Sequence, residues 1–303
     1  MKTPLLSDEG LVILLFHGVV GPSRHAVRNY TQKHLGREFF ARLMTELART
    51  GRAMSMEQVI EHHEAGADLP PRSFAVTFDD GFENNCSVAA PILADLSIPA
   101  TFYVTSGFIE HNGMSWIDRI EYCIEAAAMP GSLRLPWEDR PRRFADAAGK
   151  IAILDQLRDR VKRDASIDVD ALITDIFAQC GVEEVHANDD PLDRKMSWRQ
   201  VAELHAHPLF TVGGHSHTHR ILSFLSPEEL EREIATSLDL LRERAGIETR
   251  HYSYPEGLAH CYSPAVIDAL QRRGIACCPT AERGVNRRAD DLFRLKRNMV
   301  AAE

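Results

Sequence analysis

The chain has 303 residues, of which 44% are hydrophobic and 26% charged, a composition typical of a soluble globular protein. Its formal net charge is −9, and no basic stripe indicates nucleic acid as a partner. The six cysteines contain no C-x-x-C pair, so we expect buried free thiols rather than a zinc finger or a disulfide framework.

The first predicted element is the apolar run 11–16, which is typical of a strand buried on both faces of a parallel sheet. The run is too short for a signal peptide or a membrane span, so we expect a cytoplasmic protein without a transmembrane segment, with peripheral membrane association left open. His17 follows this strand. Residues at the carboxyl ends of parallel barrel strands line active sites, so His17 is a candidate for substrate contact or proton transfer.

Two helices and a second buried strand are predicted next. Apolar residues recur at helical spacing over residues 38–49, and Ser55 with Gln58 has the spacing of a capping box that begins another helix. The apolar strand 74–78 then ends directly before Asp79 and Asp80. Two adjacent carboxylates repel each other unless a positive group neutralises them, and a metal ion is the simplest such group.

A long helical stretch separates this part from the next site residues. After a helix over 84–96 and a strand over 100–105, residues 117–195 have mostly helical patterns. We expect these residues to form an insertion within a single domain, 1–303, and to cap the open end of a barrel. Trp116, just before the insertion, is a candidate for stacking on a sugar ring.

A pair of histidines follows the predicted strand 209–212. His215 and His219 are four residues apart, so one helical turn would place both imidazoles on the same face. An aspartate and two histidines leave coordination positions open for water and substrate, which is the pattern of a catalytic metal site. The ligand set suits Zn²⁺ best, with Co²⁺, Ni²⁺ or Fe²⁺ as alternatives.

The remaining elements continue the alternation of strands and helices. A helix begins at Ser226 and runs to about residue 246, and another covers 264–273. Strands are expected over 251–254 and 275–278, with a final strand near Phe293. This order predicts one α/β domain built like a barrel.

Several of these segments resemble a known family. Residues 77–81 read Thr-Phe-Asp-Asp-Gly, and residues 215–219 match His-Ser-x-x-His; both are motifs of the polysaccharide deacetylases, the NodB-homology group of carbohydrate esterases, family 4. Weaker matches lie at 16–19, 98–105, 116–121 and 254–257. The resemblance implies a distorted (β/α)7 barrel of NodB type. It also implies that Asp80, His215 and His219 bind a divalent metal and that Asp79 is the general base.

Two positions depart from that family. Its third motif carries an arginine that orients the catalytic acid, two residues before the proline, where this chain has Ser253. Its late Leu-x-His motif, which supplies the general acid, is not evident, because the C-terminal region reads Phe-Arg-Leu-Lys-Arg over 293–297. The sequence therefore supports the metal site better than the proton donor.

We expect a metal-dependent hydrolase that removes an N-acyl group, above all N-acetyl, from an amino sugar or polysaccharide. A metal-bound water would be the nucleophile, because a divalent ion lowers the pKa of its water to about 7 and polarises the carbonyl. A backbone N–H near Tyr254 and Pro255 would help to hold the oxyanion. Tyr254, Pro255 and Trp116 are thus the candidates for substrate binding, and His17 is the candidate proton donor.

Other functions stay open at this point. The enzyme could be a deformylase, or a deacetylase of a lipid- or nucleotide-linked sugar. Ser253 and the missing late histidine would also fit a sugar-binding homologue with weakened catalysis, which the intact set of aspartates and histidines argues against. Detectable turnover that a chelator abolishes would separate an enzyme from such a binding module.

Overall fold

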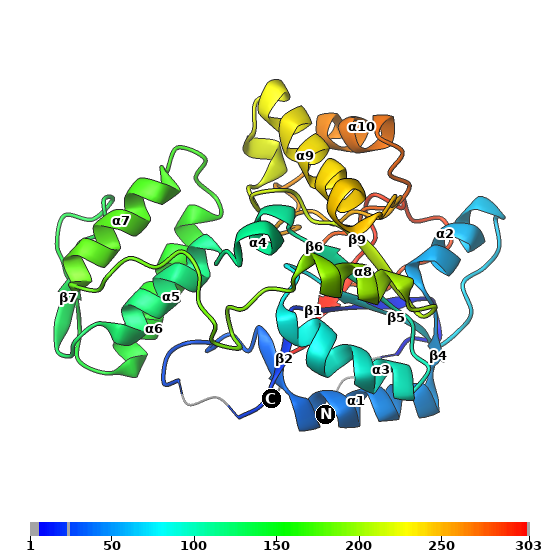
Figure 1. Ribbon diagram of the computed structural model, residues 1–303, viewed down its shortest axis with the longest axis horizontal. Helices are drawn as coiled ribbons and strands as arrows, with labels where there is room; N and C mark the ends of the chain where they lie inside the picture. Colours follow the sequence, from blue (N-terminus) through cyan, green and yellow to red (C-terminus); the bar gives the residue numbers. More distant parts are fainter. Residues whose placement is uncertain (1–5, 23–24, 302–303) are drawn as a thin grey trace.

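A parallel sheet forms the centre of the molecule. The computed structural model describes residues 6–22 and 25–301 (Figure 1). The sheet has the order β10-β1-β5-β6-β9, all parallel, with a short β4 beside β5. The strands are β1 (Val12–Phe16), β4 (Arg52–Ala53), β5 (Ser73–Phe78), β6 (Ala100–Val104), β9 (Phe210–Gly214) and β10 (Arg297–Met299). Nearly every residue of β1, β5, β6 and β9 is buried, as the continuous apolar runs predict.

Two further segments extend the sheet into the predicted distorted (β/α)7 barrel. Single parallel bridges join Gly214 to Tyr252 and His251 to Cys277. Backbone hydrogen bonds then connect residues 278–280 with residues 292–295, next to β10. With the five strands of the main path, these two segments give seven positions in the described part of the chain.

The predictions for strands 251–254, 275–278 and 293 were too long or misplaced. The first two segments make only single bridges, and the last strand begins at Arg297. Pro255 has no N–H to extend the pairing, and Glu256 turns the chain with a φ of +62°. Turns at 287–294 delay the final strand, since Asp290 and Arg294 donate backbone hydrogen bonds to Arg287 and Asp291.

Helices surround the barrel. Their apolar faces pack against it, and capping residues mark where some of them begin. Helix α1 buries Phe40, Leu43, Met44 and Leu47 against the strand aromatics. The predicted capping box of Ser55 is formed. The helices around the barrel are α1 (Arg37–Thr50), α2 (Met56–Glu64), α3 (Ala90–Asp95), α4 (Ser106–His111), α8 (Trp198–Ala206), α9 (Pro227–Ala245) and α10 (Pro264–Arg272). The predicted helix 84–96 is a π-helical turn, Asn85–Ala89, followed by α3. A 3-10 turn lies at Leu222–Phe224, and β2 (Gly18–Val20) pairs with β3 (His34–Gly36).

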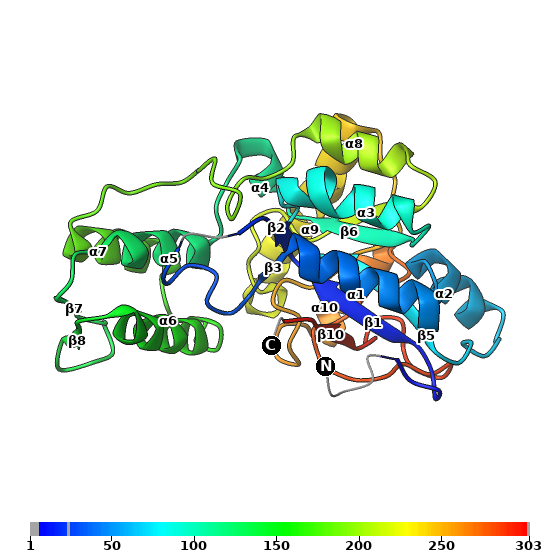
Figure 2. The ribbon, with the colours of Figure 1, turned by 90° about the horizontal axis from the view of Figure 1, so that it is seen from below.

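The predicted insertion forms a helical lobe next to the barrel (Figures 1 and 2), and its residues Ile117, Arg158 and Lys162 line the cleft that contains Asp79 and Asp80. It holds α5 (Trp116–Ala126), the hairpin β7 (Gly131–Leu133) and β8 (Arg142–Phe144), α6 (Ala147–Val161) and α7 (Val169–Cys180). These elements enclose their own hydrophobic cluster, which also includes Val27. None of the described helices is both long and apolar enough to cross a membrane.

Candidate active site

The turn after β5 directs its two carboxylates to different partners. Asp79 donates its backbone N–H to the carbonyl of Phe16, which holds it at the end of β1 and β5. Asp80 has a φ of +74° and Gly81 a φ of +82°. A residue other than glycine is strained in the left-handed backbone conformation, and such strained residues are common at functional sites. A Cβ on Gly81 would also lie 2.8 Å from Ile109, so this turn requires glycine.

Asp79 forms a bidentate ion pair with Arg297 from β10. The two guanidinium nitrogens lie 2.7 and 2.8 Å from the two carboxylate oxygens, and Arg297 is fully buried. The same guanidinium donates to the Ser253 hydroxyl at 2.9 Å and to the carbonyl of Thr280 at 2.7 Å. Burial acts to raise the pKa of Asp79, but Arg297, together with His215 and His17, holds the pKa below its usual value.

The two histidines of the second motif meet through a loop, so the predicted helical turn is wrong. His215 follows β9, and Ser216 and His219 both have positive φ, at 64° and 61°. The Ser216 hydroxyl accepts the backbone N–H of His219 at 2.9 Å and closes this loop. Gly214, at the end of β9, lies against Tyr252, whose ring a Cβ would approach to 2.5 Å.

Asp80, His215 and His219 fit a divalent metal. One potential ligand atom from each lies within 4.8 Å of the others. Oδ1 of Asp80 is buried, and the Nε2 atoms of His219 and His215 approach it at 3.2 and 3.5 Å without hydrogen-bond alignment. The Nδ1 atom of His215 pairs with the carbonyl of Ser253 at 2.9 Å, which fixes the ring with Nε2 toward Asp80. A buried carboxylate oxygen facing two imidazole nitrogens is a donor set typical of zinc.

A lysine neutralises the second oxygen of Asp80. The ammonium of Lys33 lies 2.9 Å from Oδ2 of Asp80 and 3.3 Å from Oδ1 of Asp118. Burial acts to raise the pKa of Asp80, yet Lys33 and His219 hold it well below its usual value. The charge of Asp80 in turn raises the pKa of His219 against the effect of burial.

The other predicted residues divide into two groups. His17 and Trp116 line the same cleft as Asp79 and Asp80. Burial lowers the pKa of His17 to about 4, and the carboxylates of Asp80 and Asp79 act in the opposite direction. The side chain of Tyr254 instead lies in the core, where its hydroxyl donates to the carbonyl of Phe293 at 3.1 Å.

Neither Tyr254 nor Pro255 lines the cleft with a side chain, so the structure does not bring them to the other site residues. The next residue, Glu256, does line the cleft and pairs with Lys162 of the lobe at 2.5 Å. Within this motif, the side chain that reaches the site therefore comes one position after the proline.

A larger cavity, lined by residues of both the barrel and the lobe, adjoins the cleft. The cleft has a volume of about 420 Å³, and the adjoining cavity has about 850 Å³. The cleft and the cavity are adjacent, because both are lined by Trp116, Lys162, His219 and Glu256. The size and position of the larger cavity suit a group attached to the reacting part of a substrate.

Sequence reasoning missed Arg297, Lys33, Glu256 and Lys162. Arg297 lies in the C-terminal segment where the family's Leu-x-His motif is expected, and that motif does not indicate an arginine. Arg297 begins the short strand β10, whose sequence is Arg-Asn-Met, and no local pattern indicates its partner Asp79, which is 218 residues away. Lys33 precedes no recognisable motif, and we find no signal in the sequence that would have indicated it.

The fold and the site together define a barrel protein with a candidate metal centre, Asp80, His215 and His219, beside a second buried carboxylate, Asp79. A family model described as polysaccharide deacetylase matches residues 66–277, more than half of the chain. The chain therefore belongs to the polysaccharide deacetylase family and is a hydrolase of the carbohydrate N-deacetylase class. A search of curated proteins gave no significant match.

Structures of other proteins share the fold. IcaB from Ammonifex degensii is 20% identical with a TM-score of 0.61, over 98% of this chain and 94% of that chain. The Streptococcus pyogenes deacetylase PplD, in complex with acetate, is 17% identical with a TM-score of 0.61, over 97% and 94%. The BpsB deacetylase domain from Bordetella bronchiseptica is 17% identical with a TM-score of 0.58, over 99% and 98%. At these identities, the likeness concerns the fold alone.

Proposed function

We propose that this protein is a metal-dependent N-deacetylase that removes an acetyl group from an amino sugar within a glycan. One observation carries the proposal. Two neighbouring carboxylates at the end of β5 have separate surroundings: Asp79 pairs with Arg297, while Asp80 offers an unpaired oxygen to His215 and His219. One carboxylate is thereby suited to proton transfer and the other to metal binding.

Asp80, His215 and His219 would hold the metal, for which Zn²⁺ is our first choice and Co²⁺, Ni²⁺ or Fe²⁺ are alternatives. Such an ion, when bound, supplies a water of lowered pKa and polarises the acyl carbonyl. The ring of His215 is held for this task by its hydrogen bond to the carbonyl of Ser253.

Asp79 would act as the general base. Arg297 keeps its carboxylate ionised and fixes its plane, so that it can accept the proton of the attacking water. We place the proton donor to the departing amine at His17, which lines the same cleft. Because burial keeps His17 neutral at pH 7, His17 must gain a proton before it can donate one to the amine. The proton that Asp79 accepts from the water would be its source.

The substrate would lie against Trp116, which lines the cleft. The cavity of about 850 Å³ gives room for further sugars or for a carrier group next to the reacting residue. Arg297 also weakens the alternative of a binding protein without turnover, because a guanidinium does contact the general base although position 253 is serine.

The test is the release of acetate and formate from a panel of free, nucleotide-linked and lipid-linked N-acyl sugars and from acetylated oligosaccharides. Each reaction is run with and without chelator, and beside Asp79→Asn. Acetate release that needs both the metal and Asp79 supports the proposal. Formate release alone would make the enzyme a deformylase, and a metal-loaded protein without any release would contradict the proposal.

A further inference from the structure

The segment of residues 25–33, which lies between β2 and β3, carries a lysine into the cleft. Residues 25–33 contain no helix or strand in the structure, yet their last residue, Lys33, lies at the metal-binding carboxylate. Its side chain is only 12% exposed, and its ammonium also lies 4.8 Å from the centre of the Phe82 ring. A lysine this deeply buried requires partners of opposite charge, which are Asp80 and Asp118.

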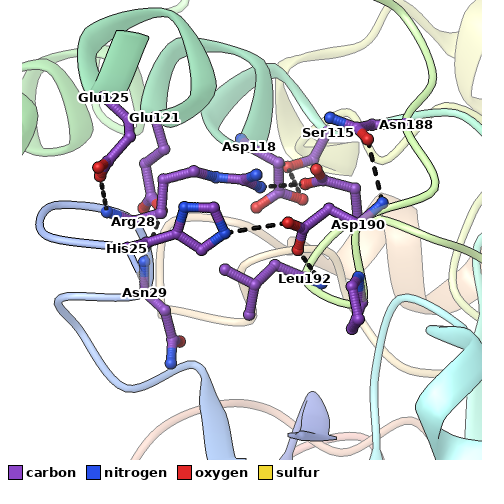
Figure 3. A network of polar contacts seen from close by, with 12 residues as sticks. His25, Arg28, Asn29, Ser115, Asp118, Glu121, Glu125, Asn188, Asp190 and Leu192 are labelled. Carbon is purple, nitrogen blue, oxygen red and sulfur yellow. Dashed lines mark hydrogen bonds and ion pairs between the residues drawn. The ribbon is translucent and has the colours of Figure 1, made fainter. Parts of the chain in front are cut away.

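The first helix of the lobe holds this segment in place. Glu125 of α5 accepts the backbone N–H groups of residues 26, 27 and 28, at 3.2, 2.7 and 2.9 Å. Glu121, one turn earlier, accepts the N–H of Asn29 at 3.1 Å. Figure 3 shows both glutamates directed from the helix toward the segment. Backbone groups that would lack partners in an irregular segment are thus satisfied by side chains.

Further contacts fix the same segment from the other side. Arg28 forms a buried ion pair with Asp193, and His25 contacts Asp190 at 3.0 Å (Figure 3). The side chain of Asn29 accepts the N–H of His34 at 2.8 Å and donates to its carbonyl at 2.9 Å. A segment held at so many points presents Lys33 in one position, which is the property of a preorganised site.

The two oxygens of Asp80 have different partners. Oδ2 accepts from Lys33 at 2.9 Å, while Oδ1 faces the two imidazoles. We propose that Lys33 is a positioning residue of the metal site, whose ammonium occupies Oδ2 of Asp80 so that the metal is bound through Oδ1 alone. This inference rests on the metal site of the proposed function.

The arrangement has two consequences for a bound ion. Ligation by one oxygen leaves a coordination position for the substrate that a bidentate carboxylate would fill. The positive charge of Lys33 also withdraws electron density from the carboxylate and repels a cation nearby, so the ion is bound less tightly and stays more electrophilic. The ammonium of Lys33 lies between the carboxylates of Asp80 and Asp118. Because Asp118 belongs to α5, the lobe contributes to the surroundings of the metal site.

The test compares Co²⁺ binding by the wild type, Lys33→Met and Lys33→Arg, through competition with a chromophoric chelator and the visible absorption of the bound Co²⁺. We expect Lys33→Met to bind Co²⁺ more tightly, by about tenfold or more, because it removes a buried positive charge that repels the ion. Its spectrum should shift to that of a higher coordination number. Lys33→Arg keeps the charge and should restore the wild-type affinity and spectrum.

A matched control and a second variant guard the interpretation. Lys162→Met removes another lysine of the same cleft, one that pairs with Glu256, and should leave the Co²⁺ spectrum unchanged. Should Lys33→Met fold poorly because Asp80 and Asp118 then lack a counter-ion, the variant Lys33→Met/Asp118→Asn removes the excess charge. Wild-type affinity and spectrum in Lys33→Met, or in Lys33→Met/Asp118→Asn, overturn this inference alone. A wild type that binds no Co²⁺ or Zn²⁺ overturns the proposed function as well.

Discussion

The guanidinium of Arg297 and the carboxylate of Asp79 form a fully buried bidentate pair between two strands that are 218 residues apart in the chain. Ser253, which stands where related sequences are expected to carry an arginine, contacts the same guanidinium at 2.9 Å. The small side chain of Ser253 leaves space for the guanidinium and accepts a hydrogen bond from it, while β10 provides the positive charge beside Asp79. The departure in the third motif is therefore offset by a residue from another strand.

Replacing Arg297 should impair both stability and activity. Arg297→Met leaves a buried carboxylate without its partner, which costs about 3–5 kcal/mol of unfolding free energy. Arg297→Lys keeps the charge but cannot form the bidentate contact, so a misplaced base should lower kcat by about 10²-fold. Chemical denaturation and acetate release measure the two effects. Arg294→Met is the control, because Arg294 is exposed and pairs with Asp291 at the surface. Equal losses in both variants would refute the role of Arg297.

The same pair predicts a change in pH dependence. A general base works above its pKa, and Arg297 holds the pKa of Asp79 below its usual value of about 3.9. Without Arg297, burial raises this pKa, so the acid limb of kcat/KM should move to higher pH in Arg297→Lys, and further in Arg297→Met. The stability that the lowered pKa contributes is present above the unfolded pKa of Asp79 and is lost as the pH falls. An unshifted acid limb would assign it to another group.

Removing a metal ligand should abolish activity without unfolding the protein. Asp80→Asn, His215→Ala and His219→Ala each delete one of three ligands, so Zn²⁺ affinity and acetate release should both disappear. His217→Ala is the control for metal binding, because His217 lies between the two histidine ligands but pairs with the Ser106 hydroxyl at 2.9 Å. Calorimetry with Zn²⁺ would disprove the assignment if His217→Ala lost the metal and His219→Ala retained it.

His17 should matter for the chemical step rather than for metal binding. Loss of a general acid lowers the rate by about 10²–10⁴-fold, so His17→Ala should lower kcat in this range while Zn²⁺ affinity is retained. His17→Gln keeps a hydrogen-bonding group without the ability to donate a proton, and should be equally slow. Full activity in either variant would remove His17 from the mechanism.

Trp116 should contribute to substrate binding. It lines both the cleft and the adjoining cavity, and loss of an aromatic contact of about 0.5–1.5 kcal/mol corresponds to a rise in KM of about two- to tenfold. Trp116→Ala should therefore raise KM for acetylated oligosaccharides with little change in kcat. Trp137→Ala is the control, since this tryptophan belongs to the lobe cluster and lines neither space. A lower kcat at unchanged KM would contradict a role in binding.

The features that could be predicted from the sequence are those in which side-chain chemistry coincides with a strand end. Asp79, Asp80 and His215 directly follow apolar runs, and parallel strands bring their carboxyl ends to one side of a sheet. Helix α1 and the capping box at Ser55 were equally predictable, because period and spacing are local properties.

What could not be predicted depends on contacts between distant residues or on turns of the backbone. Nothing local to Lys33 indicates Asp80, because an irregular segment anchored by α5 brings them together. The four-residue spacing of His215 and His219 suggested a helix, whereas two left-handed residues produce the same convergence. Tyr254 lies in a motif but points into the core, since the chain turns only after Pro255.

The distance along the chain between Asp79 and Arg297 has a consequence for biosynthesis. As the ribosome extends the chain, β1, β5 and β6 emerge long before β10, so the carboxylate at the end of β5 cannot be buried with its counter-ion until the last strand arrives. An uncompensated buried charge is costly enough to keep the unfinished barrel open. Docking of β10 therefore completes the pairing with β1 and brings Asp79 its counter-ion in one event.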